Sequence, residues 1–442
     1  MEAKGAESQI KSVHITNYYH EKSGGVKTNY DKLLQEANSH KRYVRLIVPS
    51  ESDRIEDVGE YGRIYFVQAK NAPVFDKRYR LILPFHYLQA DTPIHKILLD
   101  EKPDLIEIYD NYAITLLAGI IQKGYYKELK RPMLVYFTGE RFDTIFTSFV
   151  LGGKLGRWFS RRLMGNYNLA MFDYFIANSP FVAEELYESF LEENNPRRSK
   201  WFFNFCQRFF SASDAPFKER VAICPRGVNT EHFSPSRRSK EVQAEMRRNA
   251  NIPADSTVLL SATRLSLEKN IRLLPEIMKI LANDKERDYR LLVAGAGPQS
   301  DWLNEETEKH FPGKLILLGH LDKETLANYY ANTDVFIHPN PREPFGNVAL
   351  EAMASGACVL APNEGGILSY ATDENAWLAE ANAESFAKAV KEIVGDESLR
   401  LKKTSKAIET AQNNSTEKAI KLLFSTYDEM YEKFQRTRFS KG

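Results

Sequence analysis

Short apolar runs rich in β-branched and aromatic residues alternate along the chain with longer stretches in which apolar residues recur at helical spacing. The apolar runs predict the strands of a first sheet over residues 13–16, 43–48, 64–68, 104–108, 133–137, 174–177 and 221–224. After a turn-rich stretch over 225–229, a second set of strands is predicted over 258–262, 290–294, 315–318, 334–338 and 358–361, with helices beginning near Asn270, Gln299, Lys323 and Asn347. This alternation is typical of βαβ units and parallel sheets.

The pattern restarts near residue 226, which divides the chain into two parts of similar size. We therefore expect an α/β protein with two Rossmann-like, doubly wound domains that face each other across a cleft. The expected boundaries are a disordered tail over 1–11, an N-terminal domain over 12–225, a C-terminal domain over 226–414 and a final helix within 415–442. Because open α/β sheets bind ligands at the carboxyl ends of their strands, candidate chemistry is expected in the loops that follow each strand.

The amino-acid composition argues against several classes of protein. The 442 residues include 60 Lys plus Arg and 59 Asp plus Glu, a formal charge of +1 that provides no overall field for a nucleic acid. The three cysteines are far apart and suggest neither a disulfide framework nor a zinc site. No secretory signal is visible, and the most apolar run, over 113–121, is far short of the ~20 residues that a membrane-spanning helix needs. We expect a cytoplasmic protein that is at most peripheral to a membrane.

Two glutamates bracket a predicted turn between a strand and a helix. Glu343 follows the strand over 334–338, and Glu351 lies in the first two turns of a helix that would open at Gly346. Backbone N–H groups at Gly346 and Asn347 would suit a phosphate, and a carboxylate can accept hydrogen bonds from paired hydroxyls such as those of ribose. Two solvated glutamates would explain the pair equally well.

Two cations lie in the loop after the strand over 258–262. Arg264 and Lys269 come just before the next predicted helix, so both could converge on a diphosphate. An Arg and a Lys five residues apart are more often ordinary surface charge. Further loops at strand ends contain Gly24, Gly25, Gly295, Gly297, Gly319, Gly365 and Gly366, where a backbone could approach a phosphate. Pro298 and the lack of a third glycine argue against a dinucleotide fingerprint.

Together, Arg264-x4-Lys269, Glu343-x7-Glu351 with Pro-Phe-Gly between, the Gly365-Gly366 pair and the Gly24-Gly25 pair resemble family 4 retaining glycosyltransferases of GT-B fold. The resemblance covers roughly residues 13–431. It implies a C-terminal domain that binds a nucleotide-sugar, an N-terminal domain that binds the acceptor, and a last helix that crosses back to the N-terminal domain.

The resemblance also implies roles for individual residues. Arg264 and Lys269 would neutralise the diphosphate leaving group, and Glu343 would lie beside the transferred sugar as the third catalytic residue. Glu351 would bind the ribose hydroxyls. The remaining donor-binding residues would be Gly24, Gly25, Gly295, Gly297, Phe345, Gly346, Asn347 and Val348. No metal or other cofactor is expected, because two cations can take over this charge neutralisation and the chain contains no Asp-x-Asp.

The N-terminal motifs are similar to those of bacterial GDP-mannose-dependent α-mannosyltransferases that act on phosphatidylinositol mannosides. Where such enzymes read His-Glu-Arg-Leu-Asp, this chain has Gly139 followed by Glu140, Arg141 and Asp143. The missing histidine puts its usual role in doubt. The three charged residues are candidates for acceptor binding, with a structural salt bridge as the alternative. The resemblance implies GDP-mannose as donor, with a UDP-sugar as the alternative.

Two basic, aromatic stretches suggest a membrane surface as a partner. Residues 151–165 place apolar side chains at helical spacing between four basic residues, and residues 197–210 combine four basic residues with six aromatic ones. Neither stretch contains an acidic residue. Such segments can lie in a bilayer interface, which would favour a lipid or lipid-linked glycan as acceptor. The alternative is a core-facing helix and an ordinary insertion.

Two other function classes stay open. A nucleotide-sugar epimerase of similar fold would share the two-domain pattern, but it is not expected to carry the Arg-x4-Lys and Glu-x7-Glu set. A catalytically inactive scaffold subunit is suggested only by Gly139. Transfer or hydrolysis of a donor would exclude it.

Overall fold

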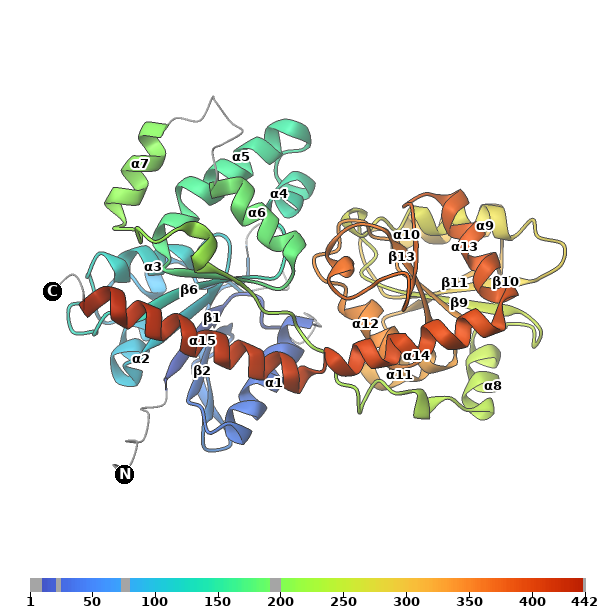
Figure 1. Cartoon of the computed structure of the whole chain (residues 1–442), viewed down its shortest axis with the longest axis horizontal. Helices are drawn as coiled ribbons and strands as arrows, with labels where there is room; N and C mark the ends of the chain where they lie inside the picture. Colours follow the sequence, from blue (N-terminus) through green and yellow to red (C-terminus); the bar gives the residue numbers. More distant parts are fainter. Residues whose placement is uncertain (1–9, 21–24, 73–79, 191–199, 440–442) are drawn as a thin grey trace. The chain divides into compact units, whose positions relative to one another are not determined.

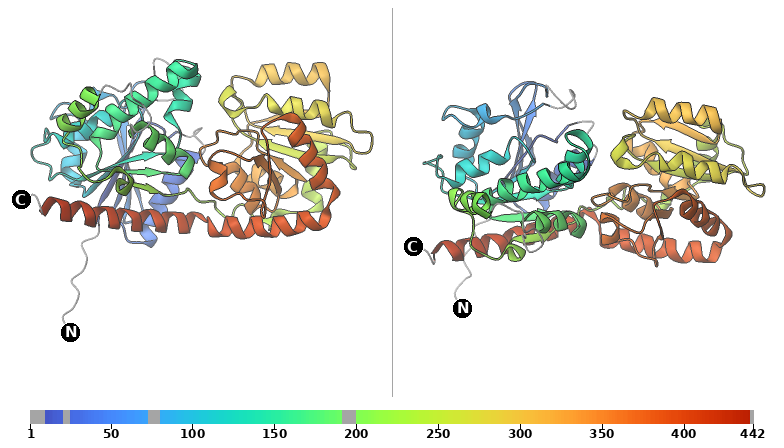
Figure 2. Two further views of the ribbon diagram at one scale, coloured as in Figure 1. Left: turned by 45° about the horizontal axis from the view of Figure 1, so that its top comes forward. Right: turned by 90° about the horizontal axis from the view of Figure 1, so that it is seen from above.

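The computed structural model describes residues 10–20, 25–72, 80–190 and 200–439. The chain divides into two compact units. Unit 1 comprises residues 1–224 and 420–442, and unit 2 comprises residues 225–419. Figure 1 labels their helices and strands, and in each unit the strands lie between helices (Figure 2). The α/β class with two Rossmann-like parallel-sheet domains is confirmed.

Unit 1 is built on an eight-stranded sheet of order β3-β4-β2-β1-β5-β6-β7-β8. Its strands are β1 (Ser12–Thr16), β2 (Val44–Ser50), β3 (Arg54–Val58), β4 (Gly62–Gln68), β5 (Leu105–Tyr109), β6 (Met133–Thr138), β7 (Tyr174–Ala177) and β8 (Val221–Ile223). Its helices are α1 (Gly25–Ser39), α2 (Pro93–Glu101), α3 (Thr115–Gln122), α4 (Phe142–Phe149), α5 (Gly153–Asn166), α6 (Pro180–Phe190), α7 (Lys200–Phe209) and most of α15 (Thr416–Phe439). All neighbouring strands are parallel except β3, which pairs antiparallel with β4.

Helix α15 covers one face of the unit 1 sheet together with α1. Its buried residues Ile420, Phe424, Tyr427 and Met430 join the same apolar cluster as those of α1. The Tyr427 hydroxyl donates a hydrogen bond to the buried carboxylate of Glu107 on β5. These contacts attach the last helix to unit 1 through both apolar packing and a buried hydrogen bond.

Unit 2 has a six-stranded parallel sheet of order β11-β10-β9-β12-β13-β14. Its strands are β9 (Thr257–Ala262), β10 (Tyr289–Ala294), β11 (Leu315–Gly319), β12 (Val335–Ile337), β13 (Cys358–Pro362) and β14 (Trp377–Ala379). Its helices are α8 (Lys240–Asn249), α9 (Leu273–Leu281), α10 (Ser300–His310), α11 (Lys323–Asn332), α12 (Asn347–Ala354), α13 (Ala383–Gly395) and α14 (Glu397–Asn413). Helices α9, α10 and α13 pack on one apolar cluster, and α8, α11, α12 and α14 on the other.

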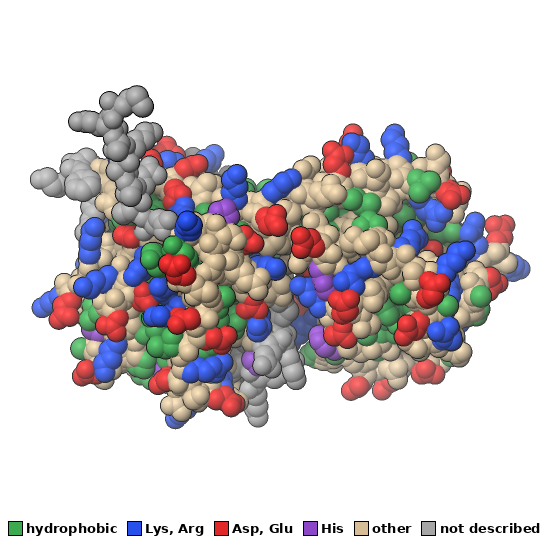
Figure 3. All heavy atoms as spheres, turned by 90° about the horizontal axis from the view of Figure 1, so that it is seen from below, with side chains coloured by type: hydrophobic (Ala, Val, Ile, Leu, Met, Phe, Trp, Pro, Cys, Tyr) green, Lys and Arg blue, Asp and Glu red, His purple; other side chains and the backbone are tan. Residues whose placement is uncertain are grey.

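Strands at the centre of each sheet are buried on both faces. Every residue of β1, β5, β6 and β9 is buried, which explains why they appear in the sequence as nearly continuous apolar runs. Cationic and anionic side chains are interspersed on the face shown in Figure 3, in keeping with the net charge of +1.

Candidate functional site

The predicted catalytic pair meets at the carboxyl ends of two adjacent strands of unit 2. Lys269 ends the short 3-10 helix η5 (Leu267–Lys269) after β9, and Glu343 lies in the loop after β12, which pairs with β9. The Lys269 ammonium lies 3.0 Å from one Glu343 carboxylate oxygen and 3.3 Å from the other. Asn340 donates a further hydrogen bond of 2.9 Å to the same carboxylate.

The carboxylate of Glu343 is held in its charged form. Burial pushes its pKa upward, but the ammonium of Lys269, the imidazole of His338 and the amide of Asn340 bring the pKa down to about 2. His338 lies behind the pair, with its Nε2 atom 3.9 Å from Glu343 Oε2, and burial lowers its own pKa. Among the described residues, neither ring nitrogen of His338 has a hydrogen-bond partner.

Helix α12 begins directly beside this pair. Its N-cap, Gly346, has a φ of +88° and offers no side chain to the first helical N–H groups. A Cβ at this position would lie 2.9 Å from the Tyr370 hydroxyl, which itself donates a hydrogen bond of 2.6 Å to the Gly346 carbonyl. Glycine therefore allows the left-handed turn and leaves the start of the helix without a side-chain cap. Unsatisfied N–H groups of this kind, together with the helix dipole, favour an anion.

The other predicted residues of this loop differ in their surroundings. Phe345 is buried against Tyr370 and attaches the loop to the core of unit 2. Val348 is half-buried and packs on the core of unit 2. Asn347 opens α12, and its buried side-chain oxygen has no hydrogen-bond partner among the described residues.

Glu351 lies in the second turn of α12 and accepts a 3.3 Å hydrogen bond from the Tyr330 hydroxyl. Burial raises its pKa to about 7, even though Lys323 and Tyr330 act in the opposite direction. Protonation of this side chain therefore changes near neutral pH. The ionised form can accept hydrogen bonds from two hydroxyls, whereas the neutral form also has a proton to donate.

Arg264, Gly295 and Gly297 lie in the loops that follow strands β9 and β10. Arg264 is exposed in the loop between β9 and η5. A Cβ on Gly295 would lie 1.9 Å from the Thr263 carbonyl oxygen, and one on Gly297 would lie 2.3 Å from that of Leu265. These glycines let the loops after β9 and β10 lie against each other. Close packing of the loops is therefore a second reason for glycine at these positions, besides approach of the backbone to a phosphate.

Gly365 and Gly366 pack against the backbone of the loop that contains Glu343. A Cβ on Gly366 would lie 1.8 Å from the Pro344 carbonyl oxygen, and the Gly366 amide donates a hydrogen bond of 2.7 Å to the carbonyl of Glu343. The backbone on either side of the Glu343 side chain is therefore fixed by close packing that only glycine permits.

The predicted residues of unit 1 form a separate group. Gly24 lies outside the described residues, and Gly25 opens α1 after β1. Arg141 and Asp143 are 5% and 1% exposed, respectively, and lie 3.0 Å apart. Arg141 also contacts Glu188 of α6 at 3.0 Å, whereas Glu140 is exposed. The burial of Arg141 and Asp143 favours the structural alternative for these two residues.

Sequence reasoning missed two partners of the 139–143 loop. Glu185 of α6 accepts hydrogen bonds from the backbone amides of Phe142 and Asp143 at 2.7 and 2.5 Å, which caps helix α4. Burial raises the pKa of Glu185. At Gly139, a Cβ would lie 2.9 Å from the Tyr109 hydroxyl, so a larger residue would require Tyr109 to move. No local sequence signal points to contacts that join residues about 30 to 40 positions apart.

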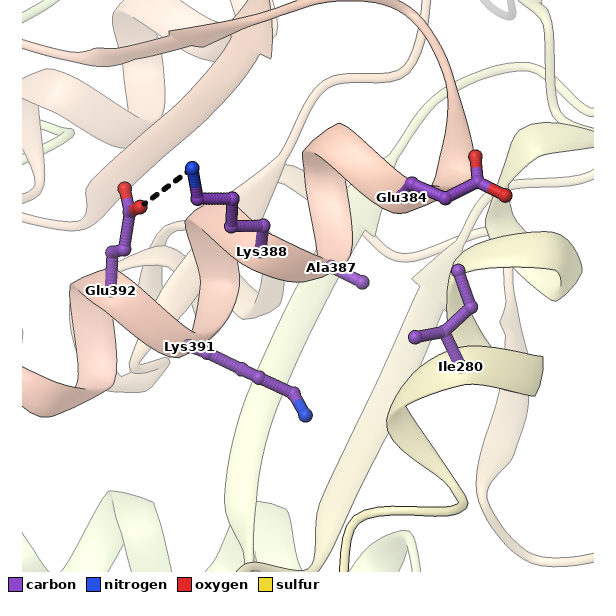
Figure 4. A pocket seen from close by; sticks show the side chains of 6 residues that line it. All are labelled: Ile280, Glu384, Ala387, Lys388, Lys391 and Glu392. Atoms are coloured by element: carbon purple, nitrogen blue, oxygen red, sulfur yellow. Dashed lines mark ion pairs between the residues drawn. The ribbon is translucent and has the colours of Figure 1, made fainter.

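A groove on unit 2 lies away from these loops. As Figure 4 shows, it is lined by Ile280 of α9 and by Glu384, Ala387, Lys388, Lys391 and Glu392 of α13. None of the predicted site residues lines it. Within the described part of the chain, no group of three or more His, Cys, Asp or Glu side chains is placed to hold a metal ion. No helix found among the described residues is long and apolar enough to span a bilayer.

Parts of the chain are similar to known glycosyltransferases. Residues 242–414 match the family described as "Glycosyl transferases group 1". The uncharacterized glycosyltransferase MJ1607 of Methanocaldococcus jannaschii is 30% identical over 41% of this chain, and the alignment spans only 47% of that relative. The GDP-mannose-dependent alpha-(1-6)-phosphatidylinositol dimannoside mannosyltransferase of Mycobacterium tuberculosis is 24% identical over 87% of this chain and 88% of that protein.

Among solved structures, HepE of Anabaena in complex with UDP has a TM-score of 0.66 at 15% identity, covering 95% of this chain and 100% of that chain. At this identity the similarity establishes the fold. The fold is that of the GT-B glycosyltransferases, and residues 242–414 of the chain match the group 1 glycosyltransferase family.

Proposed function

We propose that the protein moves a hexose from a nucleotide-diphosphate sugar to a hydroxyl of a glycan or lipid-linked acceptor, with retention of anomeric configuration and without a metal ion. The observation that carries the proposal is the Lys269–Glu343 pair beside the uncapped start of α12. These groups combine a cation, a helix N-terminus and a carboxylate that stays charged at neutral pH at one edge of the sheet.

In the proposed reaction, the bond between the anomeric carbon and the diphosphate oxygen breaks, and a new bond forms to the acceptor oxygen. The acceptor proton passes to a phosphate oxygen of the leaving group. Arg264 and Lys269 stabilise the negative charge that develops on the diphosphate, which is electrostatic catalysis. Glu343 contacts the transferred sugar, and its low pKa keeps it negative beside an oxocarbenium-like centre. Glu351 binds the ribose.

GDP-mannose is the first donor to test. The M. tuberculosis relative, which aligns over most of both chains, is named for this donor. UDP-sugars are the alternative, because the Anabaena structure contains UDP. Both donors present the same diphosphate to Lys269, so the choice between them leaves the proposed chemistry unchanged.

The acceptor is proposed to be lipid-linked and to be reached at the inner face of a membrane, where the protein would act as a peripheral enzyme. The same relative is named for a phosphatidylinositol dimannoside, which is an acceptor of this kind. The epimerase and scaffold alternatives are not favoured, since the relatives compared above are named as transferases and the Arg264, Lys269, Glu343 and Glu351 set is complete.

A donor panel tests the proposal. Thermal unfolding is followed with GDP-mannose, UDP-glucose, UDP-galactose, UDP-N-acetylglucosamine and ADP-glucose, because a ligand that binds only the folded state raises the melting temperature. We expect one donor to raise the melting temperature of the unmodified protein and of Lys279→Met, a control whose 3.7 Å pair with Glu306 lies away from the site. Lys269→Met should lose the shift. If no donor shifts melting and none is hydrolysed or transferred, the proposal fails.

A further inference from the structure

We infer that the outer faces of helices α5 and α7 form a docking surface for an anionic phospholipid bilayer. The surface consists of Leu155, Trp158 and Phe159 on α5, Trp201, Phe202, Phe205 and Phe209 on α7, and the cationic side chains around them. It lies wholly within unit 1, where the two helices pack against each other. Its existence does not depend on the proposed transferase activity.

Helix α7 divides into two faces with opposite environments. Cys206 and Phe210, the residue directly after the helix, are buried and attach it to the core of unit 1. On the opposite face Trp201 is 74% exposed and Phe205 is 49% exposed, with Phe202 and Phe209 beside them. Only one face of α7 therefore packs against the core of unit 1, although both faces carry aromatic side chains.

The exposed aromatic rings are stacked into a continuous row. The ring centroids of Trp201 and Phe205 are 6.0 Å apart, and those of Phe205 and Phe209 are 5.8 Å apart. Exposed aromatic side chains gathered on one helix are unusual on a soluble surface, where such residues are normally scattered. Rings of this kind insert into the interfacial layer of a bilayer.

Helix α5 adds a second exposed apolar segment. Leu155 is 63% exposed, and Trp158 and Phe159 are also exposed, although the Phe159 ring stacks on that of Phe146 of α4. Lys154 and Arg157, next to these residues in the sequence, are also exposed. The segment thus alternates apolar side chains with cations along one exposed stretch.

The charge around the aromatic rings specifies the partner. Neither α5 nor α7 contains an Asp or a Glu. The Arg162 guanidinium lies 4.5 Å from the centre of the Trp158 ring, and the Lys123 ammonium lies 5.2 Å from that of Phe209. Cations that flank apolar rings fit a surface with phosphate groups above acyl chains, which is the chemistry of an anionic bilayer.

Contacts within unit 1 connect the docking surface to the loop after β6. Arg161 of α5 contacts Glu188 at 2.6 Å, and Glu188 contacts Arg141 in that loop at 3.0 Å. The bilayer-facing helix α5 is therefore braced against the 139–143 loop at the carboxyl end of a sheet strand. If the proposed function holds, docking would bring a lipid-linked acceptor toward this edge of unit 1.

Vesicle binding tests the surface without donor or acceptor. The full chain is sedimented with vesicles of phosphatidylcholine alone or mixed with phosphatidylglycerol. We expect binding to the mixed vesicles, weakened by salt, with a blue shift of tryptophan emission. Trp201→Ser with Phe205→Ser should weaken binding by about tenfold or more, since it removes two insertable rings. Trp201→Leu with Phe205→Leu should retain most of the binding. Lys154→Glu with Arg157→Glu should abolish the preference for phosphatidylglycerol.

Ile55→Ser with Leu401→Ser is the matched control. These two side chains are 62% and 67% exposed on other elements, so the substitution removes a comparable exposed apolar surface. Equal loss of binding in this control and in the α7 variant would overturn the inference. So would absence of binding to mixed vesicles, or a concentration-dependent dimer that the α7 substitutions dissociate. Because donor binding is measured separately by thermal unfolding, failure of docking and failure of the proposed function give different results.

Discussion

Replacement of Lys269 by methionine should reveal how strongly the charged pair of the candidate site is coupled. The pKa of Glu343 is about 2, against an ordinary value of 4.5. This difference corresponds to roughly 3 kcal/mol in favour of the charged form, shared among Lys269, His338 and Asn340. Because the Glu343 side chain is only 14% exposed, solvent screens the pair little. We expect Lys269→Met to lower the free energy of unfolding by about 2 kcal/mol at neutral pH.

The pH dependence of that loss follows from the direction of the pKa change. A carboxylate whose pKa is lowered by folding stabilises the protein above its unfolded pKa, and the stabilisation is lost as the pH falls from about 4.5 toward 2. The difference between the unmodified protein and Lys269→Met should therefore be largest at neutral pH and shrink in acid. Denaturant unfolding of the transition that contains unit 2, measured across this pH range, checks the expectation.

A double-variant cycle supplies the decisive comparison. Lys269→Met leaves a buried charge without its main partner, whereas Lys269→Met with Glu343→Met removes both charges and should recover much of the lost stability. Lys279→Met, which disrupts a pair with a 48% exposed lysine, should cost less than about 0.5 kcal/mol. Additive losses in the double variant, or a loss in Lys269→Met no larger than in Lys279→Met, would refute the coupling argued here.

Three further predictions concern other parts of the molecule. Because the pKa of Glu351 is about 7, donor affinity should rise between about pH 6 and 8 as the carboxylate ionises, and titration calorimetry should find Glu351→Gln weaker and flat across this range. Gly366→Ala should lower transfer by about tenfold or more and reduce the melting temperature, because its Cβ meets backbone at 1.8 Å, whereas Gly395→Ala, which meets nothing within 4 Å, should behave normally. Arg141→Met should cost about 3 to 5 kcal/mol in denaturant unfolding of unit 1, since it leaves the buried Asp143 without its main partner; a change confined to acceptor KM would instead support acceptor binding.

The central strands could be predicted because burial on both faces leaves a simple apolar signal. Two edge strands, β3 and β14, lack that signal. Residues Arg54–Val58 of β3 are almost wholly exposed and alternate charged with apolar side chains, so the sequence resembles a loop. The three residues of β14 are too short for any periodicity to appear. Prediction from pattern therefore succeeds for the enclosed central strands and misses β3 and β14, whereas the edge strands β8 and β11 keep enough apolar residues to be predicted.

The candidate site shows the same division between local and distant information. Lys269 and Glu343 each follow a predicted strand, so their motifs placed them at one sheet edge before their distance was known. The contacts of Glu185 with the 142–143 backbone gave no such signal, because they join a helix residue to a loop more than 40 positions earlier. Likewise, the sequence left open whether α7 was core or surface, since both of its faces are aromatic. Only the burial of Cys206 and Phe210 in the structure shows which face of α7 packs on the core.

The division of unit 1 between the two ends of the sequence imposes an order on synthesis. Residues 420–442 are translated after the whole of unit 2, yet they supply Phe424 and Tyr427 to the sheet made by the first 224 residues. On the ribosome, that sheet face must wait covered only by α1, with Glu107 lacking its Tyr427 partner, while unit 2 can fold as a continuous segment. A nascent chain halted before α15 emerges therefore exposes apolar strand residues to chaperones, and release of the final helix completes the earliest-made part of the protein last.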